Sequence, residues 1–238
     1  MAFFRVPFVR IVAAILLAIA VIAVAQIVSE TINHALPESL SAQQWISTSV
    51  FQLCIAFFSI LAMLAVGRGS LRPFGFTWGV RISWVRVALW LIGPQVVIAL
   101  GFLLCPQSGE SHFAADFTFW QTVIGVWLIA STCEEILTRG LVVGYLAPLR
   151  DRGLRIGGAL ISTPVIVGAV LFSVMHVPLL VMGIDRCIGI QILVTAFVIG
   201  LVAGTYREKS GSLVPAILVH MGANVVGMGL DALRGLLT

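Results

Sequence analysis

Long apolar runs separated by short polar segments dominate the chain. Each run is close to the length of about 20 residues that an α-helix needs to cross the hydrocarbon core of a bilayer. Most of the charged residues fall between the runs. We therefore predict an all-α fold, a polytopic bundle of about seven transmembrane helices. The runs cover approximately residues 8–28, 46–66, 84–104, 118–147, 157–180, 187–206 and 212–230.

The first run has a second interpretation. A basic start, an apolar stretch and the tripeptide Ala-Val-Ala at 23–25 are together typical of a secretory signal peptide. The apolar sequence continues past that tripeptide to Val28. We therefore favour a retained helix, and whether residues 1–25 are cleaved stays open at this point.

Basic residues fall mainly in alternate loops between the predicted helices. Seven spans place 11 of the 14 lysines and arginines on one side, with Arg186 and Arg234 on the other and Arg139 inside a span. Such residues gather in cytoplasmic loops. We therefore expect a multi-pass protein of the cell membrane, as in a bacterial inner membrane, with a cytoplasmic N-terminus. The 11 residues are Arg5, Arg10, Arg68, Arg72, Arg81, Arg86, Arg150, Arg152, Arg155, Arg207 and Lys209.

The composition supports a membrane location. Of the 238 residues, 60% are apolar and 10% are charged, whereas an average soluble domain has about 25% charged residues. The mean hydropathy is +1.10, and a chain of this length could not bury so much apolar surface in water. Because the loop positions explain the net charge of +4, we expect membrane lipids as partners and no nucleic acid.

The four cysteines form no CxxC motif, so neither a zinc ribbon nor a thioredoxin-like site is indicated. Cys105 and Cys187 both fall near the outer face in the predicted topology, which suggests the hypothesis of a disulfide. Unchanged mobility on reducing gels would contradict it. Cys133 has no basic neighbour by spacing, so we do not expect it to act as a nucleophile.

Gly200 and Gly204 form a GxxxG motif in the sixth run. Small residues four positions apart let helices approach closely, within one bundle or between two chains. We favour packing within the bundle over dimerisation, and the sequence does not show the oligomeric state.

Six strongly polar side chains fall deep inside the predicted spans, and few others lie so deep. An ionisable group at such a depth costs about 2.5–3.5 kcal/mol. Two of them, Glu135 and Arg139, are four residues apart and can pair on one helix face. The pair leaves Glu134 unpaired. The six residues are Glu134, Glu135, Arg139, His176, His220 and Asn224.

These polar groups are expected to lie at a similar depth. At about 1.5 Å per residue, Glu134, His176 and His220 lie about 16–24 Å from the cytoplasmic loops. For His176 this depth requires its helix to begin near Pro164, because a start at Gly157 would bring it closer to the outer surface. Interhelical hydrogen bonds alone are a weaker explanation for the six residues, since serine or threonine would supply such bonds at a lower free-energy cost in the membrane.

Three motifs occur in order on successive apolar runs. Glu134–Arg139 reads EExxxR, Phe172–His176 reads FxxxH, and His220–Asn224 reads HxxxN. The chain resembles the CPBP family of intramembrane proteases, also called the Abi family, which includes the type II CAAX prenyl endopeptidases. The resemblance covers about residues 118–230. We therefore expect residues 118–238 to form a catalytic transmembrane core and residues 1–117 to supply further helices and loops.

The resemblance implies a role for each of the six polar residues. Glu134 would activate a water molecule with assistance from His176, and a desolvated carboxylate suits a general base. His220 and Asn224 would stabilise the oxyanion of the tetrahedral intermediate, an interaction worth about 3–4 kcal/mol where one donor has been removed. The other two members of EExxxR would organise the site.

A metal is the alternative within the same class. Glu134, His176 and His220 would supply three ligands to a divalent metal such as zinc and leave a position for water. The family has been described both as metalloproteases and as glutamate proteases, and no HExxH is present. We favour the metal-free mechanism and keep the metal open.

Two other functions stay open on the sequence alone. Intramembrane carboxylates and histidines also serve as relays in transporters and ion pathways. The scaffold would also suit a non-catalytic binding protein, for example one that gives immunity against a peptide toxin. For an endopeptidase the expected substrate is a membrane-anchored protein or a peptide, and the sequence does not show whether it is lipidated.

Overall fold

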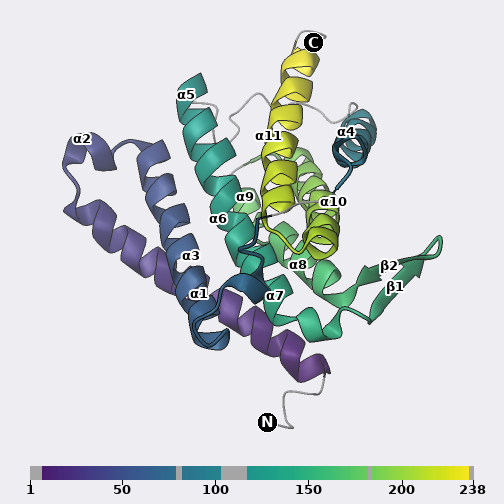
Figure 1. Ribbon diagram of the computed structural model, residues 1–238. Helices are drawn as coiled ribbons and strands as arrows, with labels where there is room; N and C mark the ends of the chain where they lie inside the picture. The colour runs from purple at the N-terminus through teal and green to yellow at the C-terminus, as the bar shows by residue number, and fades with distance from the viewer. Residues whose placement is uncertain (1–6, 79–81, 103–116, 182–183, 236–238) are drawn as a thin grey trace.

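The computed structural model describes residues 7–78, 82–102, 117–181 and 184–235. These residues are mostly helical, which confirms the predicted all-α class, and one two-stranded hairpin is added to the helices. Figure 1 shows the helices arranged around a central segment that runs through α5, α6 and α7. The chain passes from α1 at the lower end of this view to the upper end of α11.

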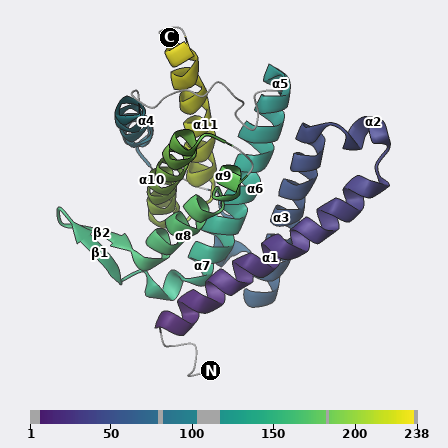
Figure 2. The same ribbon diagram turned by 180° about the vertical axis from the view of Figure 1, so that it is seen from behind.

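The N-terminal helices form a pair beside the central segment. Small buried residues on α1, Ala14, Ala18 and Ala25, allow a close approach to α3, and α1 crosses the bundle obliquely (Figures 1 and 2). The predicted spans 8–28 and 46–66 thus correspond to the first two long helices. The elements are α1 (Pro7–Ala35), α2 (Glu38–Ser41), α3 (Gln44–Val66) and the short 3-10 helix η2 (Arg72–Phe74).

The predicted helix 118–147 is present but alternates between α and π geometry. A capping box formed by Thr118 and Gln121 begins it, and every residue of its second π segment is buried. Short π segments inside helices are frequent at functional sites. The consecutive elements are α5 (Phe119–Gln121), η3 (Thr122–Ala130), α6 (Ser131–Glu135), η4 (Ile136–Val142), α7 (Val143–Tyr145) and the 3-10 helix η5 (Ala147–Leu149).

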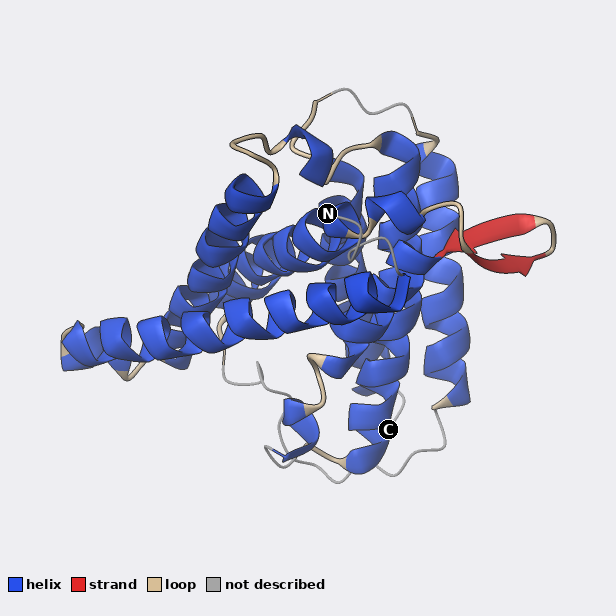
Figure 3. Ribbon diagram, turned by 90° about the horizontal axis from the view of Figure 1, so that it is seen from below, coloured by secondary structure: helices blue, strands red, loops and turns tan. Residues whose placement is uncertain are grey.

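Residues 153–162 form a β-hairpin, so the prediction of a helix from residue 157 was wrong there. Strands β1 (Gly153–Ile156) and β2 (Ala159–Ser162) pair antiparallel, and the turn glycines Gly157 and Gly158 have φ of 55° and 82°. A turn with two positive φ angles is the geometry that closes two-residue hairpins. The hairpin projects from the bundle in Figure 3.

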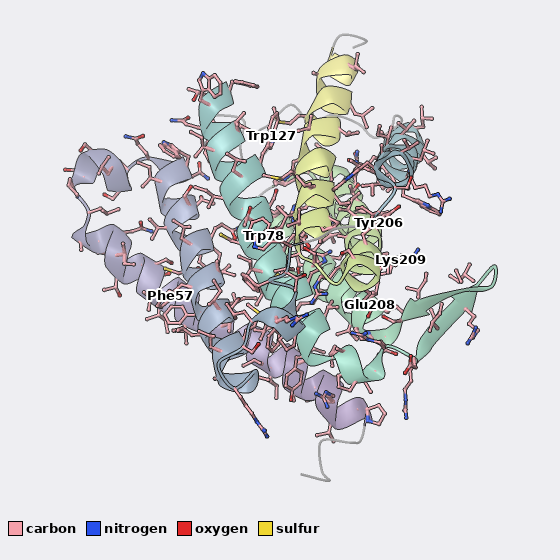
Figure 4. All side chains as sticks on the ribbon, in the orientation of Figure 1. Phe57, Trp78, Trp127, Tyr206, Glu208 and Lys209 are labelled. Carbon is pink, nitrogen blue, oxygen red and sulfur yellow. The ribbon has the colours of Figure 1, made fainter. Side chains whose placement is uncertain are left out.

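The helix after the hairpin, α8 (Thr163–Val174), begins where Pro164 predicted it. The Ser162 hydroxyl accepts a hydrogen bond from the Val165 amide and caps the helix, and proline is favoured in the first turn. The same hydroxyl donates to Glu208 at 2.8 Å, and Figure 4 shows Glu208 near the base of the hairpin. The short α9 (Pro178–Val181) follows α8.

The GxxxG motif packs within the bundle, which confirms that prediction. It lies on α10 (Arg186–Ser210) against α8. A Cβ atom at Gly200 would lie 2.8 Å from the Cα of Ala169, and one at Gly204 would lie 3.1 Å from a methyl of Val165. Glycine therefore permits a helix approach that a side chain would prevent.

The segment after η2 is bonded to the turn between α10 and the last helix, α11 (Val214–Gly235). The Leu213 amide donates to the Gly75 carbonyl at 2.9 Å, and the Ser212 hydroxyl donates to the Thr77 carbonyl at 2.7 Å. Arg207 donates to the Pro73 carbonyl at 3.2 Å. These bonds fix the start of α11 against the N-terminal part of the chain.

Five of the described helical segments are long and apolar enough to cross a membrane. The central segment 119–145 is divided by its π segments, and the apolar part of α11, Val214–Leu230, is shorter than the other five. The predicted number of about seven spans is therefore not confirmed. The five are α1, α3, α4 (Trp84–Gly101), the run Thr163–Val181 and α10.

Candidate active site

The three motifs converge where α6 and η4 meet α11 and α8. Glu134 and Glu135 end α6, and Arg139 lies in η4. His220 and Asn224 lie on α11, which contacts α6 directly. Figure 1 shows α6 between α3 and α11, so side chains from three helices can meet at its C-terminal end.

The predicted pair of Glu135 and Arg139 is present at the centre of the bundle. Arg139 Nη1 donates to Glu135 Oε1 at 2.7 Å, and both side chains are 0% exposed. The same nitrogen donates to the hydroxyl of Thr138 at 2.7 Å. The guanidinium lies over the Phe172 ring, 4.4 Å from its centroid, which adds a cation–π contact.

His220 links the buried ion pair to the second carboxylate. Its Nδ1 lies 3.1 Å from Glu135 Oε1, and its Nε2 lies 3.8 Å from Glu134 Oε2. An ionised carboxylate only accepts hydrogen bonds, so Nδ1 carries a proton and donates to Glu135. This bond fixes the ring with its other nitrogen toward Glu134.

Glu134 differs from its neighbour in access and in partners. Its side chain is 14% exposed, whereas that of Glu135 is fully buried. Glu134 Oε1 accepts a hydrogen bond from Gln52 Nε2 at 2.8 Å, and no arginine or lysine among the described residues forms an ion pair with it. Of the two adjacent carboxylates, Glu134 is thus the one that a water molecule can reach.

Gln52 was not predicted as a site residue. It lies on α3, in a segment without a usable motif, and is 8% exposed. The available signal was an amide side chain in the middle of the apolar run 46–66. Polar groups at such positions are uncommon and usually have a function.

Asn224 reaches the site through a serine that was also not predicted. Its Nδ2 donates to the Ser131 hydroxyl at 3.0 Å. Ser131 in turn donates to the Val126 carbonyl, five residues earlier, at 3.2 Å. Ser131 lies about one helical turn before the two carboxylates and fixes the orientation of the Asn224 amide. The second N–H of that amide stays available.

His176 lies in the turn after α8, and it contacts the same aromatic ring as His220. Its Nδ1 donates to the Phe172 carbonyl at 2.8 Å, which leaves Nε2 of the neutral ring as an acceptor. The Phe172 ring makes edge contacts with both histidines, with centroids 5.0 Å apart in each case. Within the described ranges, no hydrogen bond or ion pair joins His176 to Glu134.

Comparison with known proteins agrees with this geometry. Residues 116–226 match the family described as type II CAAX prenyl endopeptidase Rce1-like. The chain carries an Rce1-like domain. The resemblance predicted from the three motifs is confirmed, since the match contains all of them. No curated protein and no solved structure matches the chain.

At the level of the family, the Rce1-like domain indicates an intramembrane protease of the CAAX type. Such a protease is an integral membrane protein, and its substrate is a membrane-associated protein or peptide. The apolar helices agree with a membrane location. The match begins at residue 116, so α1, α3 and α4 lie outside it.

The alternative metal site would use Glu134, His176 and His220 as ligands. Among the described residues, no group of three histidine, cysteine, aspartate or glutamate side chains is placed to hold a metal ion. Glu134 Oε2 and His220 Nε2 lie 3.8 Å apart, whereas the described contacts of His176 are with Phe172. In this arrangement the three predicted ligands do not fit a metal centre.

The described cysteines have no assigned role in the site, although Cys133 directly precedes Glu134 in the sequence. Cys54 and Cys133 are free and buried, and buried thiols are usually inert. Cys187 is disulfide-bonded. Its predicted partner, Cys105, lies outside the described residues.

Proposed function

We propose that this protein is an intramembrane endopeptidase that hydrolyses a peptide bond by a metal-free mechanism based on Glu134. The supporting observation is the contrast between the two adjacent carboxylates. Glu135 is fully buried and neutralised by Arg139, whereas Glu134 is partly accessible and lies beside a histidine that Glu135 holds in place. One carboxylate therefore organises the site and the other is free to move a proton.

In the first step, Glu134 Oε2 removes a proton from a water molecule while the water oxygen attacks the carbonyl carbon of the substrate. The Nε2 atom of His176, left as an acceptor by the bond from Nδ1, would hold the other hydrogen of that water. The C–N bond then breaks, and Glu134 returns its proton to the leaving amine nitrogen. The reaction consumes one water, and Glu134 ends ionised as it began.

The oxyanion of the intermediate needs donors that are already in place. His220 Nε2–H and the second N–H of Asn224 are the candidates, since their other hydrogen-bonding atoms are engaged by Glu135 and Ser131. For Nε2 to donate while Nδ1 donates to Glu135, the His220 ring must carry both protons. The net charge of the site does not change as the intermediate forms, because the oxyanion appears as Glu134 becomes neutral.

We also propose that the protein spans the cell membrane, a bacterial inner membrane, seven times. The N-terminus would lie in the cytoplasm. The central segment 119–145 and α11 would be the two spans beyond the five long helices. The bias of basic residues toward one set of loops supports this orientation. The test is a reporter that works only in the cytoplasm, fused after Thr238. Activity of this reporter would contradict the proposed topology.

Comparative peptidomics tests the proposed function and seeks the substrate. Membranes from cells that produce the wild-type protein are expected to contain cleavage products that are absent when Glu134→Gln is produced at an equal level. The substrate class is a membrane-anchored protein or peptide, and the products will show whether it is lipidated. Identical product sets from the two membranes would contradict the proposal.

A further inference from the structure

A residue outside the Rce1-like domain contacts the proposed base. Gln52 lies on α3, and its Nε2 donates to Glu134 Oε1 at 2.8 Å across 82 positions of sequence. The family match starts at residue 116, so the N-terminal helices contribute directly to the site. This inference rests on the proposed function of Glu134.

The surroundings of Gln52 do not suggest a purely structural amide. The residue is 8% exposed, and the only described hydrogen bond of its side chain goes to Glu134. Its Oε1 is buried without a hydrogen-bond partner among the described residues. An unsatisfied buried acceptor is unfavourable. Serine or threonine could make an interhelical hydrogen bond without leaving such an acceptor.

The contact determines which oxygen of Glu134 can react. Gln52 occupies Oε1, so Oε2 is the oxygen that faces His220 Nε2 at 3.8 Å. A carboxylate held at one oxygen cannot rotate freely, and a general base must be aligned with the proton that it removes. Gln52 thus fixes the direction in which Glu134 acts.

The second atom of the same amide is the acceptor without a partner. Because Nε2 and Oε1 belong to one planar group, Oε1 also lies close to the Glu134 carboxylate. A peptide that enters an apolar site must keep its N–H groups hydrogen-bonded, since an unpaired one is costly. An acceptor beside the base suits a backbone N–H next to the bond that is cleaved.

We propose that Gln52 is a positioning residue that orients Glu134 through Nε2 and binds a backbone N–H of the peptide substrate through Oε1. The role belongs to α3, so the complete site includes the N-terminal part of the chain. A substrate with a methylated nitrogen at that position would lose the second of these hydrogen bonds.

Steady-state kinetics of the purified full-length protein with a peptide substrate test this role. Gln52→Leu keeps the approximate volume and removes both hydrogen bonds, so kcat should fall about ten- to a hundredfold and KM should rise. Gln95→Leu is the matched control. Gln95 is also a buried amide, 4% exposed, but it donates to Leu91 in its own helix, and its variant should keep wild-type kinetics.

The pH profile separates positioning from a merely structural role. Gln52→Glu keeps an acceptor and places a second carboxylate beside Glu134. Adjacent carboxylates hold a shared proton more strongly, so the acidic limb of the profile of kcat/KM against pH should move to higher pH. A structural residue would change the melting temperature and leave that limb in place. If Gln52→Leu fails to fold, the Gln52→Glu profile decides.

The outcomes distinguish the two proposals. If Glu134→Gln is inactive but Gln52→Leu has wild-type kinetics, or Gln52→Glu has an unshifted profile, the role of Gln52 is overturned and the proposed function stands. If Glu134→Gln keeps full activity, the proposed function fails, and the role of Gln52 fails with it.

Discussion

Replacing Glu134 with glutamine is expected to lower kcat by about 10²–10⁴-fold, the contribution of a well-placed general base. Glutamine keeps the size and the hydrogen-bonding capacity toward Gln52, whose Nε2 now donates to the carboxylate at 2.8 Å. The lost property is the ability to accept a proton from water. KM should change little, and turnover of the peptide substrate by purified protein in detergent measures both constants.

Glu30→Gln is the control for this experiment. Glu30 is an exposed carboxylate on α1, bonded only to Gln26 of the same helix among the described residues, so its variant should keep wild-type turnover. A chelator should leave wild-type kcat unchanged if the mechanism is metal-free. Loss of activity on chelation that added zinc restores would instead support the metal alternative, and an active Glu134→Gln would refute the assignment of the base.

Replacing Arg139 with methionine is expected to lower the free energy of unfolding by about 3–5 kcal/mol, the usual effect of removing one partner of a buried ion pair. Both side chains of this pair are 0% exposed, so Glu135 would be left as a buried charge without its compensating partner. The contact of the guanidinium with Phe172 would be lost as well. Denaturant-induced unfolding in detergent micelles measures the change.

The double variant Glu135→Leu/Arg139→Met tests the cause of that loss. Apolar side chains of similar volume in place of a buried ion pair are often neutral or stabilising, so most of the stability should return. Activity should not return, because His220 loses the carboxylate that accepts from Nδ1. Arg155→Met on the exposed strand β1 is the control and should unfold like the wild type. Equal destabilisation by the single and double variants would contradict this explanation.

The long helices and the central ion pair were predictable because both depend on spacing along the chain. Apolar runs of membrane-spanning length gave α1, α3, α4 and α10, and the separation of four residues brought Glu135 and Arg139 together. Such spacing patterns are local, so they do not depend on how the rest of the chain packs.

The hairpin and the π segments were missed for different reasons. Gly157-Gly158 is a known signal for a two-residue hairpin turn, but residues 157–162 are apolar enough to read as the start of a span. The π segments have no comparable signal in the sequence. They shift the register of a helix by less than a turn, and hydrophobic periodicity does not resolve that change over seven to nine residues.

The partners inside the site could not be read from one sequence. The motifs predicted which polar residues would meet at the site, but the arrangement of rings and carboxylates depends on how the helices pack. His220, and not His176, is the histidine beside Glu134 in the described contacts, and His176 instead bonds to the Phe172 carbonyl. Gln52 carried no motif, so only the contact with Glu134 identified it.

The distribution of the site over α3, α6 and α11 has a consequence for biogenesis. During synthesis Gln52 enters the membrane early, and His220 leaves the ribosome 168 residues later. The bonds from the 73–77 segment to the turn before α11 can form only then. A nascent or truncated chain would therefore hold its carboxylates without their histidine. The cell would be exposed to hydrolytic activity only after α11 had been inserted.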